Sequence, residues 1–388
     1  MRVPISRAMK TESSTHIPEL DGVRGIAILM VVVYHAFLFV PNPPTGWSAT
    51  LASFGLTGVD LFFTLSGFLI TGILLKAKGR SGYFRDFYAK RALRIWPLYY
   101  LLLFASYGLV PRLLSLHSHR PPSDVLEGRS LAVYVLLLQN LWYRDAFGPI
   151  LLASTWSLAV EEHFYVVWPW LVSAFSRKNL VFILAAVLAL SPLARLWAGL
   201  RGLNGHAIYY MTCFRLDGLS LGALLALYCE SAFFSLNRTK RMAIGALAIG
   251  TPPSLWLLLG HSQAFGPLQN SMVALASAGT VALAVWCCRA DSLLGVPLRA
   301  RWLRYVGKVS YCLYLIHQPF YCYALNGGLA RRFFGVGHGG AVCAMIFGFL
   351  ASLGIAGLSW SLFESRILKL KGRLEPRPAG SSAAVCST

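Results

Sequence analysis

Two residues that could do chemistry stand eleven positions apart in the segment RGIAILMVVVYH, with mostly apolar residues between them. If the segment is an α-helix, eleven residues make about three turns plus 20°, so Arg24 and His35 share one face, about 16 Å apart along the axis. Arg24 would then lie at one surface of a membrane and His35 beyond the middle of the bilayer. A neutral imidazole there can act as a general base; the alternative is a packing residue bonded to a backbone carbonyl.

Several other ionisable residues interrupt apolar segments, and we expect them at similar depths. They are Asp60, Glu161, Glu162, His163, Arg215, Asp217 and His317. Ionisable groups are costly inside a bilayer and usually functional, so their convergence on one layer predicts a site. Glu161 and Glu162 point about 100° apart, so at most one of them faces it. The alternative makes Arg215 and Asp217 structural and His317 a helix-end cap.

A basic cluster follows in KAKGRSGYFRDFYAKRALRIWP. Arg91 and Arg94 are three positions apart, hence neighbours on one helix face, where the third predicted span begins. A basic loop beside a membrane is often only a topology signal. Guanidinium groups also suit phosphate oxygens, and together with Arg24 these arginines predict a cationic mouth for an anionic ligand. Acyl-coenzyme A has a fitting shape, with phosphates at one end and a thioester that would reach His35.

The elements that must position these residues are predicted to be transmembrane helices. Of the 388 residues, 56% are hydrophobic and only 13% are charged, about half the charged share of an average soluble domain. The formal charge of +20 fits basic cytoplasmic loops better than nucleic-acid binding. We predict an all-α polytopic membrane protein with about ten spans, near 22–40, 56–76, 95–111, 156–176, 179–197, 209–229, 242–260, 270–288, 305–325 and 339–363.

The distribution of lysine and arginine predicts the topology. If the N-terminus is inside and 131–142 does not cross, the inside segments hold 26 of the 35 basic residues and the outside segments hold 8. We therefore expect both termini in the cytoplasm and a short re-entrant or surface helix near 131–152. Residues 1–370 would form one integral membrane domain, and 371–388 a disordered tail. The first apolar run lacks a cleavage site, so we expect it to be retained as a span.

Six segments taken together resemble the membrane acyltransferase-3 family, the O-antigen acetylase type. In chain order they are LDGVRGIAILMVVVYH, GVDLFFTLSGFLITGIL, FYAKRALRIWPLYY, WSLAVEEHFYVVWP, RLDGLSLGALLA and SYCLYLIHQP. The resemblance implies a multi-pass O-acyltransferase of the cell (inner or plasma) membrane, which takes an acyl group, by default acetyl, from cytosolic acyl-CoA as co-substrate. Its acceptor would be a hydroxyl of a glycan, glycolipid or secondary metabolite.

The resemblance also implies roles for individual residues. The family's basic-x10-His motif corresponds to Arg24 and His35, its R-x-x-R motif to Arg91 and Arg94, and its WSLxVE glutamate to Glu161. The arginines would bind the donor. Some members carry a C-terminal hydrolase domain, which we do not expect here because the chain ends soon after the last predicted span.

As a mechanism, we expect His35 to take the proton of the acceptor hydroxyl while that oxygen attacks the thioester carbonyl. Glu161 would orient the imidazole and stabilise the imidazolium. Asp60 is the second candidate for this role, and Glu162 is left open.

Hydroxyl groups in TLSG and three further polar residues would support the site. Thr64 and Ser66 would line the acyl channel or donate to the oxyanion, and an acyl-serine intermediate is the alternative to direct transfer. Arg215, Asp217 and His317 would have supporting roles. The acceptor would approach through 112–155.

Two other classes of protein are alternatives to the enzyme. A transporter of an acyl group or small anionic solute would also hold charges at mid-depth, but it typically shows inverted repeats, which we do not find in this sequence. A non-catalytic scaffold gives no reason to align Arg24 with His35. We expect no metal site, because the eight cysteines form no C-x-x-C pair. Neither the acceptor nor the oligomeric state is specified by a motif.

Overall fold

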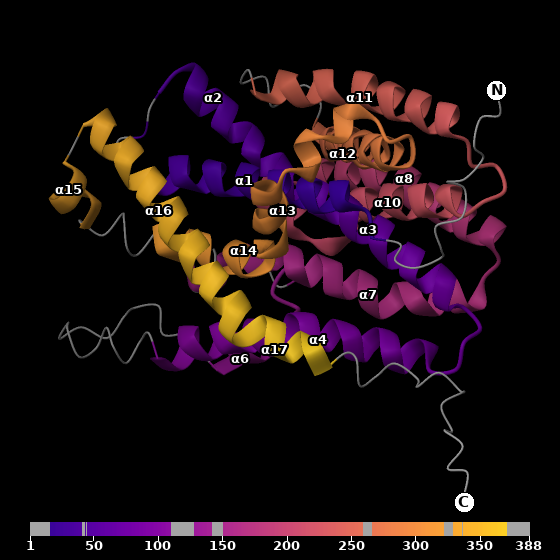
Figure 1. Ribbon diagram of the computed structural model, residues 1–388, viewed down its shortest axis with the longest axis horizontal. Helices are drawn as coiled ribbons and strands as arrows, with labels where there is room; N and C mark the ends of the chain where they lie inside the picture. Colours follow the sequence, from indigo (N-terminus) through magenta and orange to yellow (C-terminus); the bar gives the residue numbers. More distant parts are fainter. Residues whose placement is uncertain are drawn as a thin grey trace, which may run out of the picture.

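A computed structural model describes residues 16–40, 43, 45–109, 128–141, 150–258, 266–321, 329–335 and 337–370. Every regular element within these ranges is helical, as predicted (Figure 1). The α-helices are α1 (Pro18–Phe39), α2 (Trp47–Ser53), α3 (Gly58–Ala77), α4 (Tyr83–Phe104), α6 (Gly128–Val135), α7 (Trp156–Ala174), α8 (Arg177–Leu200), α9 (Gly205–Tyr210), α10 (Leu216–Cys229), α11 (Leu236–Leu258), α12 (Gly266–Arg289), α13 (Arg301–Lys308), α14 (Ser310–Pro319), α15 (Leu329–Phe334), α16 (His338–Ser359) and α17 (Ser365–Lys369). Shorter 3₁₀ or π turns are η1 (Phe54–Thr57), η2 (Ala105–Leu109), η3 (Ile150–Thr155), η4 (Thr212–Phe214), η5 (Leu293–Gly295), η6 (Pro297–Arg299) and η8 (Trp360–Glu364).

Six helical stretches of the described chain are long and apolar enough to cross a membrane. They are Pro18–Phe39, Trp47–Ala77, Tyr83–Leu109, Arg177–Leu200, Gly266–Arg289 and His338–Lys369. Each coincides with a predicted span, and together they identify a multi-pass membrane protein.

The other four predicted spans take different forms, so the described residues do not show ten continuous apolar spans. α7 and α11 have 19 and 23 residues but interrupt their apolar sequence with polar groups and prolines. α10 has only 14 residues, because the chain turns at η4 before it. The predicted span 305–325 is divided into α13 and α14.

Two predicted segments lie partly or wholly outside the described residues. In the region near 131–152, the structure describes α6, whose eight residues are too short to cross a bilayer, and the turn η3. The predicted tail 371–388 lies outside the described residues, as does much of the predicted acceptor route 112–155.

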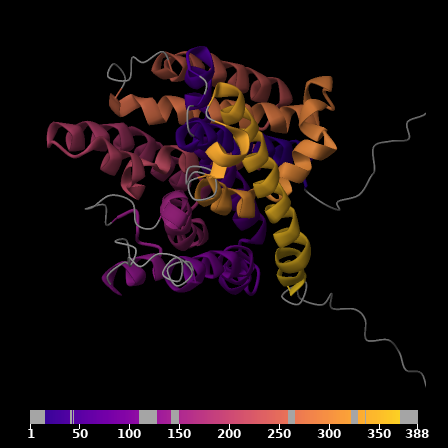
Figure 2. The same cartoon turned by 90° about the vertical axis from the view of Figure 1, so that its left-hand side faces the viewer.

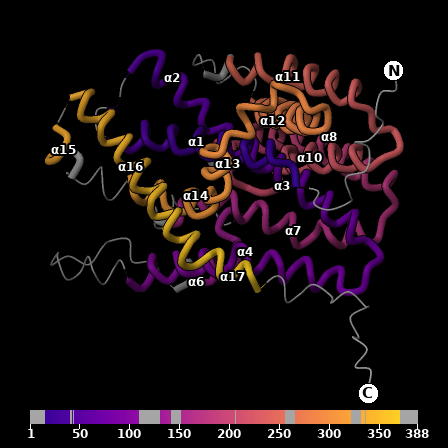
Figure 3. Tube along the Cα trace, in the orientation of Figure 1, coloured from indigo at the N-terminus to yellow at the C-terminus, as the bar shows by residue number. Residues whose placement is uncertain are grey.

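The core of the bundle is formed where α3 packs on α10 and α1 packs on α3. A Cβ at Gly67 would collide with the carbonyl oxygen of Leu219, and one at Gly222 with that of Thr64, so α3 and α10 are in backbone contact. Small residues at helix interfaces allow such close packing in membranes. α11 and α12 lie side by side at one edge of the trace (Figure 3), and α16 crosses the bundle obliquely (Figures 1 and 2).

The start of α1 and the short helix α13 are held together closely. Pro18, Glu19 and Asp21 occupy the first turn of α1, where proline fits sterically and acids complement the helix dipole. Arg299 donates to Glu19 at 2.6 Å, which fixes the turn before α13 to this end. This contact places α13, which carries Arg301, Arg304 and Lys308, beside the start of α1.

Candidate active site

A large cavity, which we call the vestibule, opens where α1 begins and α17 ends. Its volume is about 1170 Å³, which is large enough for a cofactor-sized ligand. Eight basic side chains line it: Arg24, Lys76, Arg91, Arg94, Arg289, Arg301, Arg304 and Lys308. The vestibule is therefore a strongly cationic entrance.

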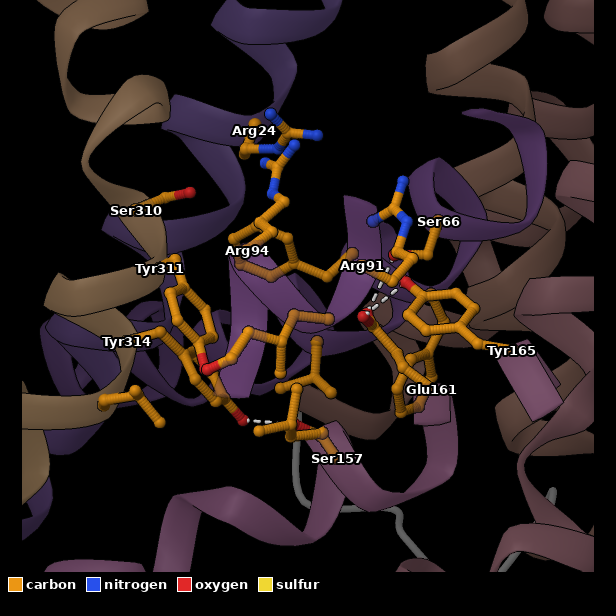
Figure 4. A pocket seen from close by; sticks show the side chains of 16 residues that line it. Arg24, Ser66, Arg91, Arg94, Ser157, Glu161, Tyr165, Ser310, Tyr311 and Tyr314 are labelled. Atoms are coloured by element: carbon orange, nitrogen blue, oxygen red, sulfur yellow. Dashed lines mark hydrogen bonds between the residues drawn. The ribbon is translucent and has the colours of Figure 1, made fainter. Parts of the chain in front are cut away.

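A smaller cavity of about 100 Å³, which we call the chamber, shares part of its lining with the vestibule. Figure 4 shows the side chains that line the chamber. Its polar lining residues are Arg24, Ser66, Arg91, Arg94, Ser157, Glu161, Tyr165, Ser310, Tyr311 and Tyr314. Six residues line both cavities, and the three arginines among them form the neck between the cavities: Arg24, Arg91 and Arg94, with Ser66, Tyr165 and Tyr311. The two cavities together make a funnel that is wide and cationic at one end and narrow at the other.

The three neck arginines have no salt bridge to any carboxylate among the described residues. Arg91 stacks its guanidinium over the ring of Tyr165, 5.2 Å from the ring centroid. Figure 4 shows Arg24 and Arg94 together at the neck. Half-buried guanidinium groups without a protein anion are available to an anionic ligand. The sequence prediction that Arg24, Arg91 and Arg94 come together agrees with this geometry.

Glu161 lies in the chamber between two hydroxyl groups rather than beside His35. Ser66 donates to its Oε1 at 2.9 Å and Tyr165 donates to its Oε2 at 2.8 Å. The expected pairing of this carboxylate with His35 is therefore absent. Glu162 lines neither cavity, in agreement with the helix geometry that allows only one of the two glutamates to face the site.

Asp60 is likewise engaged elsewhere. Its Oδ1 accepts from Nη2 of Arg215 at 3.0 Å, in a fully buried pair that joins α3 to the start of α10. The remaining Nε and Nη1 of Arg215 have no hydrogen-bond partner, and the guanidinium is 4.6 Å from the ring centroid of Tyr209. The expectation that Asp60 orients His35 fails for the same reason as for Glu161: helix rotation directs the carboxylate to another partner.

The partner of His35 is a second imidazole, that of His317. Nδ1 of His35 lies 2.9 Å from the carbonyl oxygen of Val31 and 3.2 Å from Nε2 of His317. Nδ1 of His317 lies 3.0 Å from the carbonyl oxygen of Leu313. The ring centroids are 4.8 Å apart, and His317 is fully buried.

These contacts determine which ring nitrogens carry hydrogen in the neutral pair. A backbone carbonyl oxygen can only accept, so Nδ1 of each ring is the donor. Nε2 of His317 is then an acceptor, and it shares the Nδ1–H of His35 with the carbonyl of Val31. Nε2 of His35 keeps its lone pair, and no described residue donates to it. This arrangement is the one that a general base requires.

The expectation of one cavity shared by Arg24 and His35 holds only for Arg24, because His35 lines neither the vestibule nor the chamber. Tyr314 lies next to both the chamber and His317. It lines the chamber, and its ring centroid lies 5.7 Å from that of His317. Its hydroxyl lies 2.6 Å from that of Ser157. The chamber therefore ends at a tyrosine behind which the two imidazoles lie.

The remaining predicted residues have structural contacts. Asp217 accepts from Nη1 and Nη2 of Arg195 at 3.0 and 2.8 Å and from Ser271 at 2.6 Å, all deep in the bundle. Thr64 is fully buried and donates to the carbonyl of Asp60, so only Ser66 of the two TLSG hydroxyls reaches the chamber. These contacts favour the structural interpretation of Asp217, and Thr64 does not line the chamber, contrary to the expectation.

Sequence reasoning missed several lining residues. Tyr165 lies four positions after Glu161 on α7, a spacing that could have indicated a shared face. Tyr311 and Tyr314 are three apart on α14 and belong to the same motif as His317. The basic residues of α13 belong to none of the quoted motifs, and the sequence indicates only a cytoplasmic location for them.

A multi-pass helical protein with a cationic funnel that leads toward a pair of imidazoles has the features of a membrane-bound group transferase. More particularly, the chain belongs to the acyltransferase-3 family, whose model, described as an acyltransferase domain, matches residues 17–360. This confirms the family predicted from the six sequence segments.

Among known proteins, the chain is similar to YrhL of Bacillus subtilis (strain 168), with 32% identity over 80% of this chain and 49% of YrhL. It is also similar to the peptidoglycan O-acetyltransferase OatA of Listeria monocytogenes, with 29% identity over 79% of this chain and 50% of OatA. The O-acetyltransferase OatA of Staphylococcus aureus (strain NCTC 8325) is 26% identical over 81% of this chain and 52% of OatA. The chain thus spans about half the length of these curated relatives. No solved structure matches it.

Proposed function

We propose that the protein is an O-acetyltransferase of the cell membrane, which moves an acetyl group from cytosolic acetyl-CoA to a hydroxyl of a cell-envelope glycan. Family membership supports acyl transfer, and the names of the two OatA relatives support acetyl as the acyl group. The name of the Listeria monocytogenes relative supports peptidoglycan as the acceptor class. The observation that carries the proposal is the cationic funnel, because its arginines have no carboxylate partners among the described residues and its narrow end approaches His35 and His317.

The donor would enter from the vestibule. The neck arginines Arg24, Arg91 and Arg94 bind phosphate oxygens of acetyl-CoA, and the slender acyl-bearing arm enters the chamber. Glu161 holds Ser66 and Tyr165 in place on the chamber wall. A wide anionic head and a thin reactive arm match the wide and narrow parts of the funnel.

The acyl transfer itself would use His35 as the base. Its Nε2 takes the proton of the acceptor hydroxyl as that oxygen bonds to the thioester carbonyl carbon, which forms a tetrahedral intermediate. The carbon–sulfur bond then breaks, the thiolate takes the proton back from the imidazolium, and the ester and free CoA leave. His317 keeps Nδ1–H of His35 oriented throughout, as the carboxylate does in a Ser-His-Asp triad.

The side chain of Tyr314 must move for this reaction to occur. It closes the chamber toward the imidazoles in the present structure, with its hydroxyl held by the carbonyl of Ser154 at 3.0 Å and by the hydroxyl of Ser157. Both are neutral hydrogen bonds of modest net strength, so a bound acyl arm can displace the ring.

The direct test is acetyl transfer by the purified protein in lipid nanodiscs, with labelled acetyl-CoA and soluble peptidoglycan fragments. His35→Ala should lower turnover by about 10²-fold or more, since a general base contributes roughly that factor. Arg241→Ala, at an exposed position that lines neither cavity, is the matched control. Wild-type protein that transfers no acetyl group, or a His35→Ala variant with unchanged turnover, would refute the proposal.

Ser66→Ala separates direct transfer from an acyl-serine intermediate. In the direct mechanism the variant keeps most of the turnover, and acid quenching of the wild type traps no labelled protein. Loss of transfer in Ser66→Ala, together with label on the wild-type chain, would replace direct transfer by the two-step route.

A further inference from the structure

The basic residues of α13 form a second cationic group, separate from the neck. Arg301, Arg304 and Lys308 line the vestibule but not the chamber. Their positions are three and four apart, so they share one face of the helix. They therefore lie at the wide end of the funnel, where a bulky ligand head would stay.

Close packing of α13 on α1 fixes this group beside the neck. A Cβ at Gly25 would collide with the carbonyl oxygen of Leu303, and one at Gly307 with the carbonyl oxygen of Asp21. Backbone contact at both points sets the position of the α13 face relative to Arg24. The spacing between the two cationic groups is thus built into the fold rather than left to a loop.

The charge of α13 is not neutralised by the protein. Arg301, Arg304 and Lys308 make no salt bridge within the described chain, and Lys308 lies 4.6 Å from the ring centroid of Trp360. Nε of Arg304 is buried and has no hydrogen-bond partner, a situation that buried donors rarely show without a ligand or water.

The three acidic residues of the vestibule do not change this conclusion, because the partner of each lies outside α13. Asp21 pairs with His16 at 2.8 Å and Glu230 with Lys76 at 3.6 Å. Glu364 accepts from Ser359 at 3.0 Å. The cationic face of α13 is consequently available to an external anion.

We propose that Arg301, Arg304 and Lys308 bind the 3′-phosphate of the CoA nucleotide, while the neck arginines bind its diphosphate. This assignment rests on the proposed function, because it takes acetyl-CoA as the donor. Two separate cationic groups suit a ligand with two separate phosphate groups at its wide end, whereas a donor with one phosphate group would need only the neck. Arginine and lysine are suitable ligands for such a terminal phosphate.

The experiment compares acetyl-CoA with acetyl-dephospho-CoA, which lacks only the 3′-phosphate, as donors for the wild-type protein in phosphatidylcholine nanodiscs. Loss of a phosphate that accepts charge-assisted hydrogen bonds should raise KM by about tenfold or more at similar kcat. Equal KM values for the two donors would overturn the inference and leave the proposed function standing. Absence of transfer from either donor would instead refute the proposed function.

The variant Arg304→Gln, alone and combined with Arg301→Gln and Lys308→Gln, should reduce the preference for acetyl-CoA, that is, the ratio of the two KM values, to about one. KM for acetyl-CoA should rise, and KM for acetyl-dephospho-CoA should stay unchanged. Arg241→Gln, outside both cavities, should keep the full preference. If the triple variant fails to fold, the thermal stabilisation of Arg304→Gln by acetyl-CoA is compared with its stabilisation by acetyl-dephospho-CoA. A difference between the two ligands as large as in the wild type would overturn the assignment.

An anionic lipid headgroup offers the same phosphate chemistry from the membrane. Nanodiscs with phosphatidylglycerol distinguish this source, since a lipid subsite would make the KM for acetyl-CoA depend on the α13 variants only when that lipid is present. A preference for acetyl-CoA that persists in pure phosphatidylcholine, and that Arg304→Gln removes, supports the nucleotide subsite. Dependence on the α13 residues only with phosphatidylglycerol would overturn it.

Discussion

Two groups of arginine residues inside the helix bundle have different partners. Arg195 and Arg215 are fully buried and bound to Asp217 and Asp60, while Arg24 and its neighbours at the neck have no carboxylate partner within the described chain. Arg195 donates to both carboxylate oxygens of Asp217, whereas Arg215 makes one hydrogen bond to Asp60 and keeps two donors without a hydrogen-bond partner. The pairing therefore separates arginines that hold helices together from those that can bind a ligand.

Removing one member of the Arg195–Asp217 pair should be strongly destabilising. Asp217→Ala leaves Arg195 buried and deprived of its anion, at a cost of about 3 kcal/mol or more. Thermal unfolding in detergent measures the loss. The double variant Arg195→Leu/Asp217→Leu should recover part of it, and a single variant as stable as the wild type would show that the pair does not hold α8 to α10.

The His35–His317 contact predicts that His317 acts through His35. His317→Ala removes one of the two acceptors of the Nδ1–H of His35 and should lower kcat roughly 10²-fold with little change in the KM for acetyl-CoA. His317→Gln supplies a side-chain oxygen that can accept the same hydrogen and should restore part of the rate. A role in packing alone would give no rescue by glutamine and no selective effect on kcat.

At the scale of helices, glycines decide how closely elements approach. Gly25 and Gly307 allow α1 and α13 to touch through their backbones, and Gly67 and Gly222 do the same for α3 and α10. These contacts explain how short helices and long spans combine to surround one funnel. The proposed catalytic and binding groups depend on them because each cavity is lined by several helices.

A larger residue at the α1–α13 contact should impair donor binding. Gly25→Val pushes α13 away from α1, so we expect a destabilisation of about 1–3 kcal/mol and a KM for acetyl-CoA that rises about tenfold or more. Gly354→Val on α16, where an added Cβ meets no atom within 4 Å, is the control. Similar KM values for the two variants would argue against a role of this contact in positioning the vestibule.

The whole molecule places the two ends of its described chain at the same cavity. His16, before α1, and Leu368, in α17, both line the vestibule. Arg177, at the start of α8, donates to the carbonyl oxygen of Glu230, another vestibule residue, so α8 runs from the vestibule end toward the opposite end. We therefore expect an even number of crossings between the two ends.

Labelling of single cysteines in a cysteine-free background tests the orientation. Because basic residues gather at the vestibule, the positive-inside rule predicts that it faces the cytoplasm. A membrane-impermeant maleimide should therefore label Leu203→Cys, after the end of α8, in intact cells. It should label His16→Cys only after permeabilisation. The reverse pattern would place the vestibule outside and exclude a cytosolic donor.

The sequence by itself determined the helical membrane class, six of the ten predicted spans, the family and the meeting of the three arginines of the neck. Apolar length, charge and motif spacing are local properties, and local helix geometry places Arg91 near Arg94. Tertiary structure alone decided that His35 meets His317 rather than a carboxylate, that Asp217 binds Arg195, and that α13 joins the vestibule. Those contacts join segments far apart in the chain, and they depend on the rotation of each helix and on how closely its glycines let a neighbour approach.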